Sequence, residues 1–145
     1  MVSNHEVVIR LLLAVLFSGL IGLEREISGK EAGLRTHSLV SLGSALVMLI
    51  SIEIFYSFKE VASVDPSRIA AQVVSGIGFL GAGAIMRFPK GISGLTTAAS
   101  LWVVAAIGLS CGGGFLKPAI LTTVLVIVIL MIFGYVARRF GWKDA

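Results

Sequence analysis

Acidic, basic and imidazole side chains are concentrated in one short stretch of a chain that otherwise contains few charges. The stretch reads GLEREISGKEAGLRTH and lies between two apolar runs. Carboxylates beside guanidinium groups form ion pairs, and Glu24 with Arg35 is a suitable pair. Arg35 and His37 also suit a phosphate, because the first turn of a helix favours anions. The alternative is an ordinary cytoplasmic loop whose charges end one helix and precede the next.

Hydroxyl side chains begin a later apolar run, which reads GLTTAASLW. We expect these hydroxyls to lie at the same end of the molecule as the charged stretch and to share a polar cap with it. The competing interpretation is a closely packed helix start, in which each hydroxyl bonds a carbonyl of its own helix. The predicted inner polar cap consists of Glu24, Arg25, Glu26, Arg35, Thr36, His37, Thr96 and Thr97.

Two further polar side chains, Glu53 and Gln72, lie inside runs that are otherwise apolar. A carboxylate within a membrane segment is costly, and it is therefore a candidate for ion binding. Glu53 is near the end of its run, however, so its carboxylate can also reach the lipid headgroups. The predicted outer polar patch, which is either structural or a cation site, consists of Glu53, Asp65, Arg68 and Gln72.

Four glycines are closely spaced in the run SGIGFLGAGAIM. The letters GIGFLG match the dinucleotide pattern G-x-G-x-x-G, but this sequence lacks the strand and the acidic residue that the pattern requires. Small residues let membrane helices approach closely. We therefore expect a helix in the middle of the bundle or at a subunit contact, with a broken helix that lines a cavity as a further alternative. The predicted helix-packing glycines are Gly76, Gly78, Gly81 and Gly83.

Membrane helices must position these groups, because 57% of the 145 residues are hydrophobic and only 14% are charged. A soluble domain has roughly 25% charged residues, and a membrane-spanning helix needs about 20 residues. Backbone groups in hydrocarbon must be paired within the protein, so each apolar run is expected to be a helix. The sequence predicts an all-α fold, a polytopic membrane bundle that forms a single domain over residues 1–145. Its five transmembrane helices are expected at residues 7–23, 38–58, 69–86, 95–110 and 115–137.

Lys and Arg are distributed unequally between the two sides of this bundle. One side holds Arg25, Lys30, Arg35, Arg87, Lys90, Arg138, Arg139 and Lys143. The other side holds Arg10, Lys59, Arg68 and Lys117. Cytoplasmic loops are the richer in Lys and Arg, so we expect the N-terminus outside and the C-terminus in the cytoplasm. The cations form no basic face, which argues against nucleic acid as a partner.

Four motifs give a resemblance to a known family. GLERE, AGLRTH, DPSRIAAQVVSGIGFLGAGAI and GLTTAASLW occur in the order and spacing of the MgtC/SapB family, and the resemblance covers about residues 11–112. It implies a multi-pass protein of the bacterial inner membrane. It also implies that the residues of these motifs are important to the protein. They include members of the predicted inner polar cap, outer polar patch and helix-packing glycines, and in addition Gly33, Leu34, Gly94 and Trp102.

The resemblance carries functional implications as well. It implies a link to growth at low magnesium and a regulator that binds another membrane complex, such as the F-type ATP synthase. Many members have a cytoplasmic C-terminal domain, which we expect to be absent from this chain because it ends at Ala145. We also expect a homo-oligomer in the lipid bilayer.

A cation transporter or channel is the alternative function. Mg²⁺ prefers carboxylate and water ligands, and Glu53 is the one acidic residue within an apolar run. A ring of Glu53 side chains in a symmetric oligomer would strengthen that alternative. We do not expect an enzyme, because the sequence offers no intramembrane Ser/His/Asp set. We do not expect a cofactor either. The sequence leaves a bound metal open.

Overall fold

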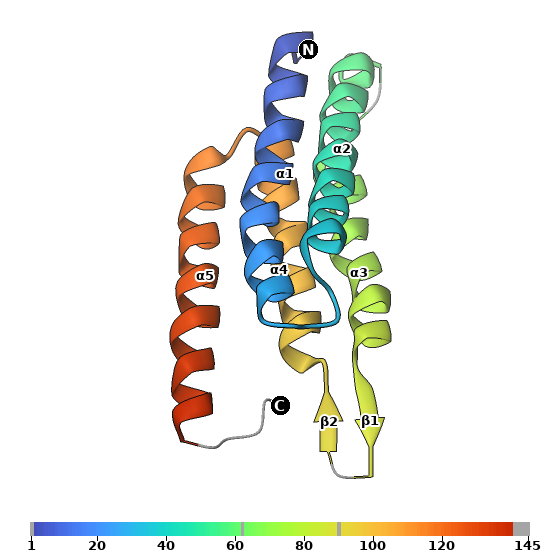
Figure 1. Cartoon of the computed structure of the whole chain (residues 1–145). Coiled ribbons are helices and arrows are strands. Elements are labelled where there is room, and N and C mark those ends of the chain that lie inside the picture. The colour runs from blue at the N-terminus through green and yellow to red at the C-terminus, as the bar shows by residue number, and fades with distance from the viewer. Residues whose placement is uncertain (1, 62, 90, 141–145) are drawn as a thin grey trace.

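Five helices form the structure, a computed structural model that describes residues 2–61, 63–89 and 91–140 (Figure 1). The predicted all-α membrane bundle is confirmed at the level of its five helices. Lys90 and Lys143, which were counted for the orientation, lie outside the described residues. In chain order the elements are α1 (Asn4–Ile27), α2 (Leu34–Phe58), α3 (Ser67–Ala84), β1 (Met86–Phe88), β2 (Gly91–Ser93), α4 (Leu95–Gly112) and α5 (Leu116–Arg139).

Four of the described helices are long and apolar enough to cross a membrane, namely α1, α2, α4 and α5 over Leu116–Ala137. Helix α3 is not among them, because its 18 residues include Arg68 and Gln72 besides four glycines. It nevertheless packs along α2 and α4 in the same bundle. Among the described helices, α3 is therefore the one that lacks a stretch long and apolar enough to count as a candidate membrane span.

Helix α4 is the centre of the bundle, since it packs against each of the other four helices. Half of its apolar stretch, 50%, is buried, against 11% for α5. The prediction that the glycine-rich helix lies in the middle, packed on all sides, is wrong. Figure 1 shows α3 at one edge of the bundle and α5 at the other.

The first two helices begin before their predicted starts, and a capping box accounts for the first of them. The Ser3 hydroxyl accepts a hydrogen bond from the Glu6 backbone N–H, and the Glu6 carboxylate accepts one from Ser3 N–H. This reciprocal pair satisfies free donors at a helix start, so α1 begins before residue 7. Helix α2 likewise begins at Leu34, which brings Arg35, Thr36 and His37 into its first turn.

A two-stranded hairpin follows α3 where the sequence predicted helix up to residue 86. Its antiparallel strands pair Met86 with Ser93 and Phe88 with Gly91. Phe88 precedes a proline, which disfavours helical backbone. The chain enters α4 at Gly94, whose φ of 88° is the left-handed conformation that favours glycine.

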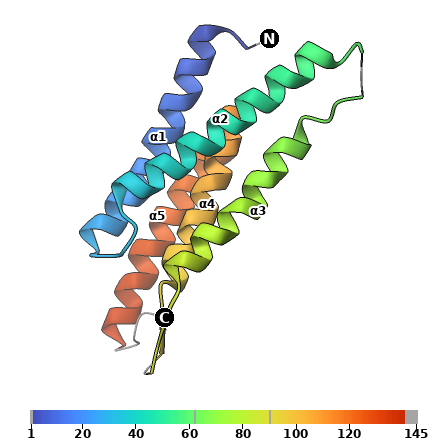
Figure 2. The ribbon, with the colours of Figure 1, turned by 90° about the vertical axis from the view of Figure 1, so that its right-hand side faces the viewer.

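The α1–α2 connection and the hairpin lie at one end of the bundle, and the α2–α3 and α4–α5 connections lie at the other (Figures 1 and 2). This alternation agrees with five successive crossings. We call the end with the hairpin the inner end, because the distribution of Lys and Arg predicts that it faces the cytoplasm. That orientation remains a prediction.

Candidate functional site

A fully buried histidine connects α2 to α4 at the inner end. His37 is 0% exposed, and its Nδ1 lies 2.9 Å from the carbonyl oxygen of Gly33. Its Nε2 lies 3.0 Å from the hydroxyl of Ser100, which in turn donates to the carbonyl of Thr97 at 2.8 Å. We call Gly33, His37, Thr97 and Ser100 the buried network. Its polar atoms are hydrogen-bonded, as buried polar groups must be.

Glu31 ties the α1–α2 connection to this network. Its carboxylate accepts hydrogen bonds from the hydroxyls of Thr97, at 3.2 Å, and Ser93, at 3.4 Å. A hydrogen bond from its own backbone N–H, and then those from Thr97 and Ser93, hold the pKa of Glu31 below the ordinary value of 4.5. The carboxylate lies where α4 begins and complements the positive end of that helix.

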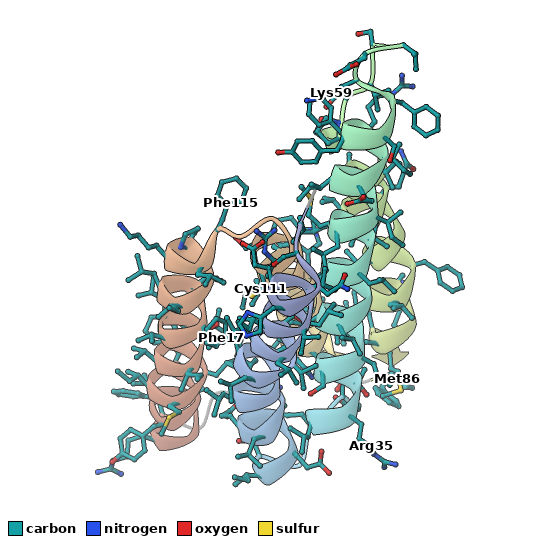
Figure 3. All side chains as sticks on the ribbon, turned by 90° about the horizontal axis from the view of Figure 1, so that it is seen from above. Phe17, Arg35, Lys59, Met86, Cys111 and Phe115 are labelled. Carbon is teal, nitrogen blue, oxygen red and sulfur yellow. The ribbon has the colours of Figure 1, made fainter. Side chains whose placement is uncertain are left out.

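Arg25 is an almost completely buried cation, with 3% exposed surface. Its Nη1 lies 3.6 Å from Glu24 Oε2, and the Ser28 hydroxyl donates to Glu24 Oε1 at 2.8 Å. Arg25 Nε and Glu24 Oε2 have no hydrogen-bond partner among the described residues. The predicted pair of Glu24 with Arg35 is wrong, because Arg35 is exposed and points away from the bundle (Figure 3).

The remaining members of the predicted inner polar cap separate into one that caps a helix and two that do not. Glu26 accepts a hydrogen bond from the backbone N–H of Leu34 at 2.7 Å and so caps α2, which has no side-chain cap of its own. Thr36 and Thr96 are exposed, and their hydroxyls make no hydrogen bond with the described residues. A phosphate site that combines Arg35 with His37 is not formed, since one is exposed and the other is buried.

Close helix packing depends on glycines other than the predicted set. A Cβ on Gly22 would lie 2.8 Å from Leu34 Cα, and one on Gly112 would lie 2.9 Å from Met48 Cβ. A Cβ on Gly108 would collide with the Ser41 carbonyl and lie 2.8 Å from Ser44 Cβ. These glycines hold α1 and α4 tightly against α2.

The predicted packing glycines lie mostly on an open surface of the chain. A Cβ on Gly76, Gly78 or Gly83 would meet nothing within 4 Å, and the prediction that they pack the interior of a single chain is wrong. A Cβ on Gly81 would make an ordinary contact of 3.7 Å with the Cβ of Ala98 on α4. The subunit-contact alternative for the other three remains a prediction.

Three of the four members of the predicted outer polar patch lie together at the opposite end. Asp65, Arg68 and Gln72 line an open concavity of about 470 Å³, and Glu53 does not line it. The hydroxyl and backbone N–H of Ser67 donate to Asp65 at 2.7 and 2.8 Å and hold the pKa of Asp65 below its ordinary value of 3.8. The patch therefore caps the start of α3, and no cluster of three or more His, Cys, Asp or Glu occurs anywhere in the described chain.

Several residues whose hydrogen bonds connect the helices at these two ends were not identified from the sequence. Glu31 was treated as part of an ordinary loop, and Ser100 was not assigned to His37. Arg10 donates from Nη1 to the carbonyl of Gly112 at 2.9 Å, which ties α1 to the end of α4. Glu31 stands in a charged stretch that was already singled out, so its charge was the available signal, whereas its partners became visible only in three dimensions.

Comparison with known proteins identifies relatives over most of the chain. The MgtC family model matches residues 11–139. A protein of Escherichia coli strain K12 named "Putative magnesium transporter YhiD" is 50% identical over 144 residues, which is 96% of this chain and 66% of that protein. Protein MgtC of Salmonella typhimurium strain LT2 is 43% identical over 132 residues, or 91% of this chain and 54% of that protein.

A further relative extends this similarity. Protein SapB of Bacillus subtilis strain 168 is 37% identical over 141 residues, which is 95% of this chain and 61% of that protein. The chain thus spans between 54% and 66% of the length of these relatives. No solved structure matches this chain.

Proposed function

The chain belongs to the MgtC family, a family of multi-pass membrane proteins, and we propose that it is a non-catalytic regulator that binds another membrane complex during adaptation to low magnesium. The observation that carries this proposal is the uncovered face of α3. Ala71, Ser75, Gly78 and Ala82 recur every three or four residues, so they share one side of the helix. All four are exposed.

The composition of this face favours protein over lipid as its neighbour. Small residues allow the backbone of another helix to approach closely, and a Cβ on Gly78 would meet nothing within 4 Å in this chain. Exposed Gln72 and Arg68 add polar groups that hydrocarbon would leave without partners. By contrast, α5 exposes large aliphatic side chains along most of its length and suits lipid.

The F-type ATP synthase of the bacterial inner membrane is the partner that we would test first. ATP-driven proton pumping is measured in inverted membrane vesicles that contain the synthase, with and without the chain. We expect wild-type chain to reduce pumping and Gly78→Leu, which adds bulk to the α3 face, to lose at least half of that effect. Gly43→Leu on α2 is the matched control, because a Cβ on Gly43 also meets nothing within 4 Å.

Unchanged pumping in the presence of folded wild-type chain at equal abundance would rule out this synthase as the partner. Equal loss in Gly43→Leu and Gly78→Leu would rule out the α3 face. The mass of the chain in lipid nanodiscs distinguishes a second copy from a different complex. If Gly78→Leu lowers that mass, the face belongs to the homo-oligomer that we also propose.

Transport of Mg²⁺ or another cation is the second candidate. Glu53, half-buried within α2, has no hydrogen-bond or ion-pair partner among the described residues, and one relative carries a magnesium-transporter name. Flux of Mg²⁺ into sealed liposomes is measured for wild type, for Glu53→Gln and for the exposed control Glu60→Gln. Flux that Glu53→Gln alone abolishes would favour transport over regulation, and absent flux in folded wild type would contradict transport.

A further inference from the structure

The hydrogen-bond partners of His37 determine how many hydrogens its ring nitrogens must carry. Gly33 offers Nδ1 a carbonyl oxygen, which only accepts hydrogen bonds, so the 2.9 Å contact requires a hydrogen on Nδ1. The Ser100 hydroxyl has a single hydrogen, and in the 2.8 Å bond it is given to the Thr97 carbonyl. Ser100 Oγ must then accept from Nε2, 3.0 Å away. All three contacts are hydrogen bonds at the same time only when the ring carries two hydrogens, as in the protonated imidazolium.

A neutral ring cannot make all three bonds. If Nδ1 keeps its hydrogen for Gly33, the Ser100 hydroxyl must turn to donate to Nε2, and the Thr97 carbonyl loses this donor. If Nε2 carries the hydrogen instead, two lone pairs face each other between Nδ1 and Gly33. The first arrangement is the less costly, because it places no two acceptors against each other and only the Thr97 carbonyl gives up a hydrogen bond. The direction of the Ser100 hydroxyl therefore follows the charge of His37.

Charged groups of both signs lie near the ring. Helix α1 presents Arg25 and Glu24, which act on His37 with opposite signs. Helix α4 has no charged residue, and the one charge of α3, Arg68, lies at the other end of the bundle. Glu31 reaches the same turn of α4 through the Thr97 hydroxyl. The Glu31 carboxylate is thus bonded to the side chain of the same residue whose carbonyl Ser100 contacts.

We propose that His37 is a proton-binding site, and that its occupancy sets the direction of the Ser100 hydroxyl and so the hydrogen bonding of the first turn of α4. As pH falls, Nε2 takes a proton from a hydronium ion, and the Ser100 hydrogen turns from Nε2 to the Thr97 carbonyl. An O–H bond of hydronium breaks, the Nε2–H bond forms, and a water molecule is left. The site goes beyond the proposed regulatory function, because it makes the inner end of the bundle responsive to pH.

Nuclear magnetic resonance of the full chain in lipid nanodiscs tests the site directly. His5→Gln removes the exposed second histidine and leaves His37 as the one imidazole. With ¹⁵N-labelled histidine we expect a neutral ring with hydrogen on Nδ1 at high pH and a ring with both nitrogens protonated at low pH. A neutral ring with hydrogen on Nε2, or a ring that stays neutral from about pH 8 to about pH 5, the range in which histidine ordinarily titrates, would overturn the proposal.

The coupling to α4 has its own readout. The ¹³C shift of the Thr97 carbonyl is expected to move with the His37 titration in wild type and to lose that movement in Ser100→Ala. Ser110→Ala, on the same helix and half-buried, is the matched control and should keep it. Ser100→Thr restores a hydroxyl and should restore the response. A Thr97 shift that still follows pH in folded Ser100→Ala would contradict the coupling, and the ring titration remains decisive if that variant does not fold.

Discussion

At the scale of single residues, the charged stretch acts mainly by ending and starting helices. Glu26 caps α2 and Glu31 complements the start of α4, and outside this stretch, at the opposite end, Asp65 caps α3 in the same way. Each carboxylate lies at the positive end of a helix, where it satisfies free N–H groups or nearby hydroxyls. The dense charge therefore has a structural use at the inner end, and Arg25 and His37 are the ionisable side chains of that stretch that the fold buries.

Glu31→Gln tests the contact between the α1–α2 connection and α4. The folded state lowers the pKa of Glu31 below 4.5, so this stabilisation is fully present above pH 4.5 and is lost as pH falls through the lowered folded-state value. At pH 7 we expect the variant to be less stable by roughly 0.5–1 kcal/mol, as for one exposed charge-assisted contact. Below that folded-state value the difference should vanish.

Thermal unfolding in detergent measures this difference at pH 7 and at a series of lower pH values. Glu60→Gln is the control, because Glu60 is exposed at the opposite end of the bundle and makes no hydrogen bond through its side chain with the described residues. A Glu31→Gln deficit that does not shrink as the pH is lowered stepwise from 7 to well below 4.5 would show that the charge is not responsible.

At the scale of elements, the positions of the helices could be predicted from the sequence, and their neighbours could not. Apolar runs bounded by charge, Gly or Pro identify helices because lipid leaves no other way to pair the backbone. The hairpin between α3 and α4 was missed, since its short strands have no alternating pattern. The close packing of Gly108 was missed because the backbone that it packs against, at Ser41, is distant in sequence. No local sequence pattern predicts such a contact.

Gly108→Ala tests the close approach of α4 to α2. The added methyl group would collide with the Ser41 carbonyl, which is backbone and cannot move aside as a side chain does. Overpacking of this kind costs about 1–3 kcal/mol, although alanine favours a helix over glycine by about 1 kcal/mol. We expect a net loss of stability in the free energy of unfolding.

For Gly76→Ala on α3 we expect no loss of stability, in contrast to Gly108→Ala. A Cβ there meets nothing within 4 Å, so only the helix preference of alanine remains and the isolated chain should be unchanged or slightly more stable. Both variants are compared with wild type by thermal unfolding under identical conditions. If Gly108→Ala proved as stable as Gly76→Ala, the tight contact between α4 and α2 would be absent in the membrane.

At the scale of the whole molecule, the candidate site could be predicted only in part. The sequence identified the inner end as polar and included His37 and Thr97, because hydroxyl and charged residues flank the runs on that side. It also paired Glu24 with the wrong arginine and left Ser100 out of the predicted inner polar cap, because pairing depends on which face of each helix turns inward. His37 lies in the first turn of α2, and it belongs to the core because α1 and α4 pack against that helix.

The orientation of the bundle is the last property that the distribution of Lys and Arg predicts. Ile27 at the inner end is 79% exposed, and Val61 at the opposite end is 80% exposed, which makes them matched positions for labelling. In intact cells a membrane-impermeant maleimide should label Val61→Cys and should reach Ile27→Cys only after the membrane that holds the protein is permeabilised. Cys111 is buried and sets the background in both variants. Labelling of Ile27→Cys but not Val61→Cys in intact cells would reverse the orientation, and the buried network would then lie on the outer side, where His37 would respond to external pH.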